Sequence, residues 1–379
     1  MRVLIDGRIH GADGIGRYTR SVVAGLCASH PPDVDVAVLH PGTARRYSRA
    51  DGEELLSAAV ESTADLVHLF DYRVPVAPPA EFATIVTVHD VLRVVCPDLC
   101  YSDAEFASRF GETALTELRE IVADLREVAE FPVARTPGSS HEEFLGRMLA
   151  LAVRQADSVI TPTRALARQL CDLVPVRDKL RVSPWGVDHL PPTTGGQPAA
   201  IPDRYLLYVG QARPHKGLPA LLDAVPRTAL YRGGAPLVLA GRDFQHDSPA
   251  TRVVARALGS HRVLPLGEVS DSALAALYAH ATVLVHLADH EGFGFPPLEA
   301  LAHGCPVVAS DLPVLRETLG PHAAFADPRD PDHVAEQLDR VVAADGPARR
   351  AARTSWARHF SWQRHVDDLI TCYRGLPPR

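Results

Sequence analysis

Residues 290–299 read His-Glu-Gly-Phe-Gly-Phe-Pro-Pro-Leu-Glu, a glycine-rich loop that runs into a pair of prolines. An apolar, β-branched run over residues 282–287 precedes this loop and is typical of a buried parallel strand. A short helical pattern over residues 298–302 and a second apolar run over residues 305–310 follow it. Strand, loop, helix and strand in this order predict a compact βαβ unit, the building block of a parallel sheet.

The loop has the features of an anion-binding site. Prolines suit the first positions of a helix, so the loop brings backbone N–H groups and the positive end of a helix dipole to one point. The loop residues that we expect at this site are Gly292, Phe293, Gly294 and Phe295. Glu291 and Glu299 flank them at the carboxyl end of the strand, where α/β proteins bind ligands. Two acids beside an anion site do not favour stability, whereas the hydroxyls of a sugar would use both.

Length and composition indicate a globular protein of two domains. The chain has 379 residues, 46% of them hydrophobic, which is more than one ordinary core accommodates. Its net charge of −7 argues against nucleic acid as the main partner. No run approaches the roughly 18 apolar residues of a membrane span, and the N-terminus enters a strand pattern without a signal peptide. The six cysteines lack metal-ligand spacing, so we expect a reduced, cytoplasmic protein with buried thiols. The sequence does not indicate an oligomeric state.

Short apolar runs alternate with helical or loop segments along both halves of the chain. In the first half they predict strands over residues 2–6, 34–40, 65–70, 83–89, 158–161 and 179–183. In the second half they predict strands over residues 205–209, 236–240, 263–266, 283–287, 307–310 and 323–326. The alternation predicts an α/β protein with two parallel, doubly wound sheets. Residues 190–203 are rich in proline, glycine and threonine and predict a linker between the two domains.

Two features of the first half could take part in binding. Gly14 and Gly16 lie in a turn before a helix predicted over residues 17–29, where the backbone could approach a phosphate. A structural tight turn explains these glycines equally well. His89 and Asp90 end the fourth strand and therefore face the carboxyl edge of the sheet. A His-Asp pair is more often structural than catalytic, but this position favours function.

Three further segments have recognisable patterns. Residues 103–130 have helical spacing and many acids, which predicts one or more helices with a solvated face. Residues 131–140 predict a loop that caps the cleft of the first domain or lies beside it. Residues 356–374 have helical spacing with large aromatic side chains, which predicts a C-terminal segment docked on protein.

The block from Gly210 to Gly217 follows the first strand of the second domain and contains two cations. Arg213, a planar fork, and Lys216, a compact point charge, suit a diphosphate at a strand–helix junction. Ordinary surface charge is the alternative. Lys216 is one of only two lysines in the chain, and this rarity favours function.

Four of these features resemble the retaining glycosyltransferases of family four. They are the glycine turn that ends in Gly16-Arg17-Tyr18, His89-Asp90, the Gly210…Arg213…Lys216 block and Glu291-x7-Glu299, of which the last is highly specific. The resemblance implies the GT-B fold, in which two Rossmann-like domains face each other across a cleft. The first domain, over residues 1–190 and 360–379, would bind the acceptor, with the C-terminal helix crossing back onto it. The second domain, over residues 203–355, would bind the nucleotide sugar.

The resemblance also implies roles for the site residues. Arg213 and Lys216 would bind the donor diphosphate and offset charge on the departing nucleotide. Glu291 would hold the hydroxyls of the transferred sugar, and Glu299 those of the ribose. Backbone N–H groups of Gly16 and of residues 292–295 would complete the phosphate cradle. His89, a further catalytic candidate, would lie near the sugar and the acceptor. Gly14, Asp90 and Gly210 would also bind substrate.

These assignments predict a retaining hexosyltransferase whose donor substrate is a nucleotide-diphosphate sugar. Arg213, Lys216 and helix N-termini would stabilise the leaving diphosphate, so that neither a metal nor a cofactor is needed. The Asp-x-Asp sequence Asp33-Val-Asp35 lies at a strand start and does not indicate a metal site. The base and the sugar of the donor are not indicated.

The acceptor is predicted from charge. Acids over residues 103–130 should repel anionic lipid headgroups, which favours a small soluble acceptor, including a cationic aminocyclitol of antibiotic biosynthesis. One alternative is a mannosyl- or glucosyltransferase acting on a polysaccharide or lipid-linked acceptor. Others are a nucleotide-sugar epimerase or hydrolase, with His89 and Glu291 as its acid/base pair, and a catalytically silent nucleotide-sugar-binding protein.

Overall fold

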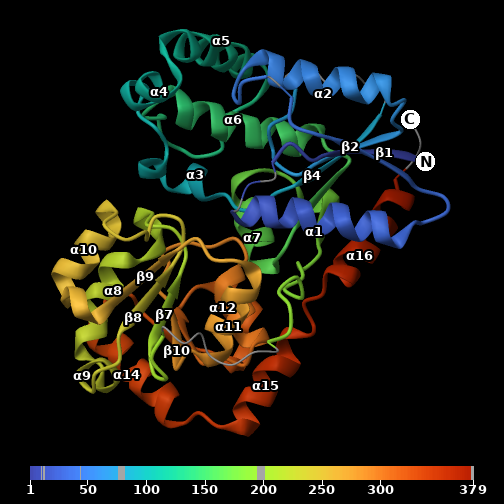
Figure 1. Cartoon of the computed structure of the whole chain (residues 1–379). Coiled ribbons are helices and arrows are strands. Elements are labelled where there is room, and N and C mark those ends of the chain that lie inside the picture. Colours follow the sequence, from blue (N-terminus) through green and yellow to red (C-terminus); the bar gives the residue numbers. More distant parts are fainter. Residues whose placement is uncertain (10, 12, 43, 76–81, 194–200, 377–379) are drawn as a thin grey trace. The chain divides into compact units, whose positions relative to one another are not determined.

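The computed structural model describes the chain except for residues 10, 12, 43, 76–81, 194–200 and 377–379 (Figure 1). It forms two compact units: Met1–Trp185 together with Trp362–Arg379, and Gly186–Ser361. The chain therefore passes into the second unit at Gly186, before the linker predicted over residues 190–203. The reason is that residues 186–193 already contact the second unit, where His189 pairs with Glu299. Seven residues of the predicted linker, 194–200, lie outside the described part of the chain.

The first unit is built on a parallel six-stranded sheet in the order β2-β1-β3-β4-β5-β6. Its strands are β1 (Arg2–Asp6), β2 (Asp35–Leu39), β3 (Leu66–Leu69), β4 (Ala83–Thr87), β5 (Ser158–Thr161) and β6 (Leu180–Val182). All six strands predicted for the first half are present. They are short, apolar and buried along β3, β4 and β5, as expected for strands covered on both faces.

Helices cover both faces of this sheet. One face carries α2 (Arg49–Glu61), α4 (Asp103–Phe110), α5 (Glu112–Val128), α6 (Ser140–Gln155) and α7 (Arg164–Leu173), which share one core with Leu4, Val67 and Val86. The other face carries α1 (Gly14–Ser29) and α16 (Trp362–Arg374), which lie side by side (Figure 1). The short elements are α3 (Leu92–Val95), η1 (Pro97–Leu99) and η2 (Arg177–Lys179).

The acidic segment forms two helices, which agrees with the prediction of one or more. Gly111, with φ of 95°, separates α4 from α5. Several of its acids are not simply solvated, because Asp103 pairs with Arg119, Glu117 with Arg45, and Asp124 with Arg49. These pairs neutralise part of the charge from which a cationic acceptor was predicted.

The loop predicted over residues 131–140 is present and is tied to its own unit. Arg135 pairs with Glu142 and also donates to the carbonyl of Val94 at 3.2 Å. The N–H of Gly138 donates to Glu142 Oε2 at 2.7 Å. Glu142 is 2% exposed, so the loop is anchored on a buried carboxylate at the start of α6.

The C-terminal segment docks on the first unit. The aromatic pattern predicts that this segment docks on protein, and the family resemblance predicts the first domain as its place. The segment is not one helix: α15 (Pro347–Ala357) belongs to the second unit, and α16 begins at Trp362. Trp362 and Tyr373 are buried against the first unit. A run of hydrogen bonds between buried side chains holds α16 there: Tyr373–His68 at 2.8 Å, His68–Thr87 at 2.8 Å, Thr87–Tyr18 at 3.3 Å, Tyr18–His365 at 3.1 Å, His365–Ser183 at 2.8 Å and Ser183–Asp368 at 2.9 Å.

The second unit has its own parallel six-stranded sheet, in the order β12-β11-β10-β7-β8-β9. Its strands are β7 (Leu206–Val209), β8 (Leu237–Ala240), β9 (Val263–Gly267), β10 (Val283–His286), β11 (Val307–Ser310) and β12 (Ala324–Ala326), and all six were predicted. The 3-10 helices are η3 (Pro214–Lys216), η4 (Val225–Arg227), η5 (Ser260–Arg262) and η6 (Gly320–His322).

Two groups of α-helices pack on this sheet. Residues of α8 (Leu218–Ala224), α9 (Ala229–Arg232), α10 (Pro249–Leu258) and α14 (Pro331–Ala343) share one core with β7, β8 and β10. The helix α12 (Phe295–Ala302) packs with α11 (Asp271–His280), α13 (Pro313–Leu319) and α15, and against β10 and β11. The fold is thus the predicted one of two doubly wound α/β sheets.

Two further expectations from the sequence concern membrane-spanning helices and the cysteines. No helix in the described part of the chain is long and apolar enough to cross a bilayer. All six cysteines are free thiols. Only Cys305 and Cys372 are buried, and Cys27 is exposed, so the expectation of buried thiols is correct for two of the six cysteines.

Candidate functional site

The strand order of the second unit reverses at one point, and ligands of α/β proteins bind at such a topological switch point. From β7 the chain adds β8 and β9 on one side, and it then returns to place β10, β11 and β12 on the other. The neighbouring strands β7 and β10 therefore flank the topological switch point. Lys216 follows β7 and Glu291 follows β10, so the two motifs singled out in the sequence meet at this point.

The local backbone brings the two loops into contact. Gly217 follows Lys216 with φ of 68°, and a Cβ at this position would lie 1.8 Å from the carbonyl oxygen of Leu287. Only glycine allows this approach, because any side chain would collide with the backbone after β10. The N–H of Asp289 also donates to the carbonyl of His215 at 2.9 Å. The loop after β7 therefore rests on the backbone that leads to Glu291.

Glu291 lies at the centre of a buried polar cluster. Its Oε1 accepts hydrogen bonds from Lys216 Nζ at 2.6 Å and from His286 Nε2 at 2.9 Å. The Glu291 side chain is 10% exposed. Burial by itself would raise the pKa of this carboxyl, but the Lys216 charge and the His286 hydrogen bond outweigh it and hold the pKa well below its usual value. Glu291 is therefore a fixed carboxylate.

The other residues of the cation block are arranged around Lys216. Arg213 is exposed and donates from Nε to Gln211 Oε1 at 3.2 Å, so it does not contact Glu291 in this structure. Gly210 follows β7, and its N–H donates to the carbonyl of Ala240 at 3.0 Å. Asp243 accepts from the N–H of Ala212 at 2.9 Å and fixes the path of the loop. The block thus contains one cation that is paired with Glu291, Lys216, and one exposed cation, Arg213.

The glycine-rich loop leads into α12 as predicted. Gly294 is the N-cap with φ of 86°, and a Cβ there would lie 2.5 Å from Leu315 Cδ2. Prolines occupy the first turn of the helix. Phe293 and Phe295 are buried with ring centroids 5.2 Å apart, and Gly292 precedes them. The aromatic side chains therefore pack inward.

Glu299 lies in α12 and is 2% exposed. Its Oε1 accepts from His189 Nε2 at 2.9 Å, and its Oε2 from the hydroxyl of Tyr278 at 2.9 Å. Each carboxylate oxygen of Glu299 thus accepts a hydrogen bond from a side chain of the second unit. His189 and Tyr278 were not predicted, because their separation from Glu299 along the chain gives no local signal.

The candidates of the first half lie in the other unit. His89 is buried, and its Nε2 bonds to the carbonyl of Phe70 at 2.7 Å, while Nδ1 has no hydrogen-bond partner among the described residues. Burial lowers its pKa, so the ring is neutral at pH 7. Asp90 accepts from the N–H of Leu92 at 2.9 Å. Gly14 begins α1, and the N–H of Gly16 donates to the capping residue Asp13 at 2.9 Å, which gives the turn a structural role.

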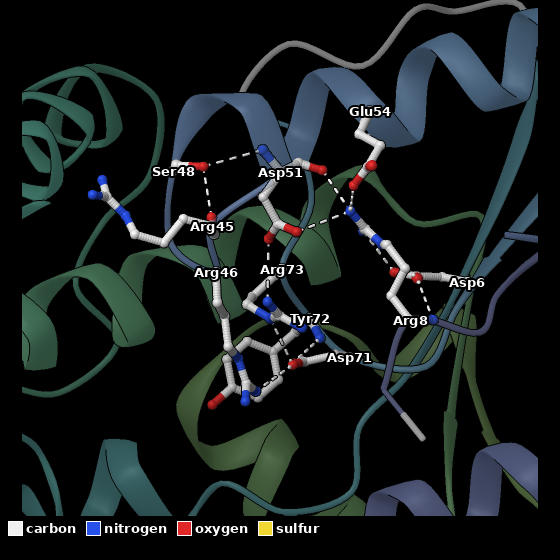
Figure 2. A network of polar contacts seen from close by, with 10 residues as sticks. All are labelled: Asp6, Arg8, Arg45, Arg46, Ser48, Asp51, Glu54, Asp71, Tyr72 and Arg73. Atoms are coloured by element: carbon white, nitrogen blue, oxygen red, sulfur yellow. Dashed lines mark hydrogen bonds and ion pairs between the residues drawn. The ribbon is translucent and has the colours of Figure 1, made fainter. Parts of the chain in front are cut away.

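The first unit also has a charged network that sequence reasoning missed (Figure 2). The network lies at the switch point of the first sheet. Asp6 is the last residue of β1 and Arg8 follows it, while Asp71 and Arg73 follow β3. Arg8 and Arg73 both bind Asp51 in the first turn of α2, at 2.9 and 3.1 Å. A cavity of about 280 Å³ adjoins it, and its lining includes Ser48, Arg49, Asp51, Arg73, Phe144 and Met148.

Metal-binding side chains are not grouped in the described part of the chain. No cluster of three or more His, Cys, Asp or Glu residues there could hold an ion. The aspartates of the Asp33-Val-Asp35 sequence have separate arginine partners: Asp33 pairs with Arg374 at 2.5 Å and Asp35 with Arg2 at 2.9 Å. These pairs explain both acids without a ligand.

Comparison with known proteins agrees with this architecture. Residues 197–357, within the second unit, match the family described as glycosyl transferases group 1. The O-antigen chain mannosyltransferase B of Escherichia coli is 27% identical over 300 residues, which cover 77% of this chain and 70% of that protein. These findings support a glycosyltransferase.

Solved structures support the same fold. Sucrose-phosphate synthase from Thermosynechococcus elongatus superposes with a TM-score of 0.65 at 19% identity, over 98% of each chain. HepE of Anabaena, solved with UDP and glucose, superposes with a TM-score of 0.64 at 15% identity, over 99% of this chain and 100% of that one. At these identities the likeness shows the fold and does not indicate a substrate. The chain shares the fold of these structures, with a doubly wound α/β sheet in each of its two units.

Proposed function

We propose that the chain is a retaining, metal-independent glycosyltransferase that moves a hexose from a nucleotide-diphosphate sugar to an acceptor hydroxyl. The observation that carries the proposal is the 2.6 Å contact between Lys216 Nζ and Glu291 Oε1 at the switch point of the second sheet. It places a cation suited to phosphate and a carboxylate suited to hydroxyls side by side, and a sugar diphosphate needs both.

The proposed chemistry assigns one task to each group. As the bond from the sugar to the diphosphate breaks, negative charge grows on the leaving phosphate, and Lys216 and Arg213 would stabilise it. Glu291 would accept hydrogen bonds from the sugar hydroxyls, for which its low pKa keeps it ionised. Glu299, already oriented by His189 and Tyr278, would accept from the ribose. Retention of configuration is supported by the resemblance of the Glu291-x7-Glu299 motif.

For the acceptor, we propose a small soluble molecule that binds the first unit. The support is the cavity of about 280 Å³ beside Asp51 and Arg73, which approaches the roughly 300 Å³ at the lower end of small-molecule sites. The comparisons do not support an aminocyclitol, and the arginine partners of the acidic helices weaken its electrostatic basis. A saccharide acceptor is the second candidate, favoured by the O-antigen relative.

Calorimetric titration tests the donor assignment. The metal-stripped protein is titrated in EDTA with UDP, GDP, ADP and dTDP, and we expect tight binding of one of them. The glucose or mannose conjugate of that nucleotide is then supplied with candidate acceptors, and the anomeric configuration of the product is read by NMR. Absence of binding by all four nucleotides, or an inverted product, would contradict the proposal.

A single variant tests the role of Glu291. Glu291→Ala should abolish transfer while the circular-dichroism spectrum and the cooperative unfolding stay those of the folded protein. Wild-type turnover in this variant would remove Glu291 from the mechanism and leave the fold assignment intact.

A further inference from the structure

Glu291 is held at one of its two carboxylate oxygens. Both of its hydrogen bonds, from Lys216 Nζ at 2.6 Å and from His286 Nε2 at 2.9 Å, end on Oε1. Oε2 has no hydrogen-bond partner in the part of the chain that the structure describes. The carboxylate therefore has one oxygen engaged by protein and a second that a ligand can use.

The two partners of Oε1 differ in mobility. Lys216 is 25% exposed at its side chain and carries its charge on a long flexible stem. His286 is 5% exposed at its side chain and is the last residue of β10, where it lies opposite Ala309 of the neighbouring strand. The short, buried side chain of His286 is thus anchored by the sheet, whereas the Lys216 ammonium can turn to another anion.

A donor diphosphate at this switch point would compete with Glu291 for Lys216. The diphosphate of a nucleotide sugar carries two negative charges, one on each phosphate, against the single charge of a carboxylate, and would draw the Lys216 ammonium toward itself. Glu291 would then keep only one protein hydrogen bond, the one from His286. A buried carboxylate with a single hydrogen bond from protein stays oriented only if the group that donates this bond is itself fixed. His286 is fixed by the sheet and meets this condition.

We propose that His286 is a positioning residue that fixes Oε1 of Glu291 and aims Oε2 at the hydroxyls of the transferred sugar while Lys216 turns to the diphosphate. The inference rests on the proposed function, since it concerns the same donor site. His286 acts through Glu291 and need not touch the substrate. Its effect should therefore appear in steps that involve the sugar and be small for a nucleotide that lacks one.

A pair of substitutions separates the hydrogen bond from the volume of the ring. His286→Leu fills much of the same space without a donor, whereas His286→Gln places an amide N–H near the position of Nε2. The matched control is His261→Leu, because His261 is an exposed histidine of η5, which leads into the edge strand β9 of the same sheet. Each variant is titrated with the nucleoside diphosphate that binds the wild type. Release of that nucleotide from its glucose or mannose conjugate, with water as acceptor, gives kcat and KM.

The expected pattern is a split between binding and turnover. His286→Leu should lower kcat about tenfold to a hundredfold, the scale of a lost hydrogen bond to a charged group, and should change nucleotide affinity by less than about threefold. His286→Gln should recover most of kcat, and His261→Leu should match the wild type. Wild-type kcat in His286→Leu, equal losses in both His286 variants, or a parallel loss of nucleotide affinity would each overturn the positioning role.

The protonation of the His286 ring can be measured in the wild type, so this test does not require His286→Leu to fold. Nitrogen-15 NMR of the wild type, with the signal assigned by its disappearance in His286→Gln, should show a proton on Nε2. A bare Nε2 with the proton on Nδ1 would refute the hydrogen bond to Glu291. If the wild type binds none of the four nucleotides, the proposed function fails first. If it binds one and turns over while His286→Leu does the same, only this inference fails.

Discussion

Nδ1 of His68 lies 2.8 Å from the hydroxyl of Tyr373, which follows it by 305 residues in the chain. This contact begins a run of hydrogen bonds that starts and ends on α16. If both histidines are neutral, one assignment uses every donor once: Tyr373 donates to His68, His68 to Thr87, Thr87 to Tyr18, Tyr18 to His365, His365 to Ser183, and Ser183 to Asp368. The run therefore connects the C-terminal helix to α1 and to the sheet of the first unit.

Removal of the first donor should loosen this connection. Tyr373→Phe leaves Nδ1 of the buried His68 without a donor and should cost about 1–3 kcal/mol of unfolding free energy. The control is Tyr101→Phe, because the Tyr101 hydroxyl makes no hydrogen bond to the described residues. Urea unfolding compares the two, and hydrogen exchange should show faster exchange in α16 of Tyr373→Phe. Equal stability of the two variants would contradict the prediction.

Three buried histidines of the first unit, His68 and His365 of this run and also His89, should make the stability depend on pH. Burial holds the pKa of His365 at about 3 and lowers those of His68 and His89, whereas in the unfolded chain each is near 6.5. The unfolded chain therefore binds more protons once the pH falls below about 6.5. Stability should be fully present above that value and fall toward pH 3, by up to about 1.4 kcal/mol per pH unit for each histidine.

Urea unfolding between pH 6 and pH 5 measures this slope above the range in which ordinary carboxylates titrate. His365→Gln removes one titrating group, so its slope should be smaller by up to about 1.4 kcal/mol per pH unit. A slope equal to that of the wild type would show that His365 is protonated in the folded protein. A slope of opposite sign would contradict the whole assignment.

The two cations of the donor block should contribute unequally. Lys216→Ala and Arg213→Ala should each weaken nucleoside diphosphate binding and turnover, by about 2–4 kcal/mol for a transition-state charge contact. The effect of Lys216→Ala should be the larger, because it also removes a hydrogen bond from the buried Glu291. Steady-state kinetics and calorimetry on both variants decide this. Unchanged kinetics in both would remove the diphosphate assignment.

The contact between the two loops should depend on Gly217. Gly217→Ala adds a strained φ of 68° and a Cβ 1.8 Å from the carbonyl of Leu287, so the loop that carries Lys216 must shift. We expect a loss of about 1–3 kcal/mol from strain and a marked loss of nucleotide affinity. Gly234→Ala is the matched control, because φ there is 106° but a Cβ would meet no atom within 4 Å. It should lose stability alone. Equal nucleotide affinity in the two variants would contradict the prediction.

Local patterns in the sequence were sufficient for the architecture. All twelve strands, the helix start at the two prolines and the docking of the C-terminal segment on protein follow from apolar periodicity, proline and glycine positions and aromatic content, which act over a few neighbouring residues. That this segment returns to the first unit was predicted from the family resemblance. The same patterns indicated Lys216 and Glu291 as candidates, since their residue types suit phosphate and hydroxyls. The boundary of the second unit at Gly186 was missed by a few residues, because it depends on which unit the segment around His189 contacts.

Which side chains meet was decided only by the tertiary structure. Nothing in the order of residues pairs Lys216 with Glu291, His189 with Glu299, or Tyr373 with His68, because such pairs form across strand ladders and crossover connections. The network around Asp51 was invisible for the same reason, since Asp6, Arg8 and Arg73 converge only when β1 and β3 lie side by side. Periodicity along the chain specifies which face of an element is buried. The identity of the partner across that face is set by the packing of elements that are distant in sequence.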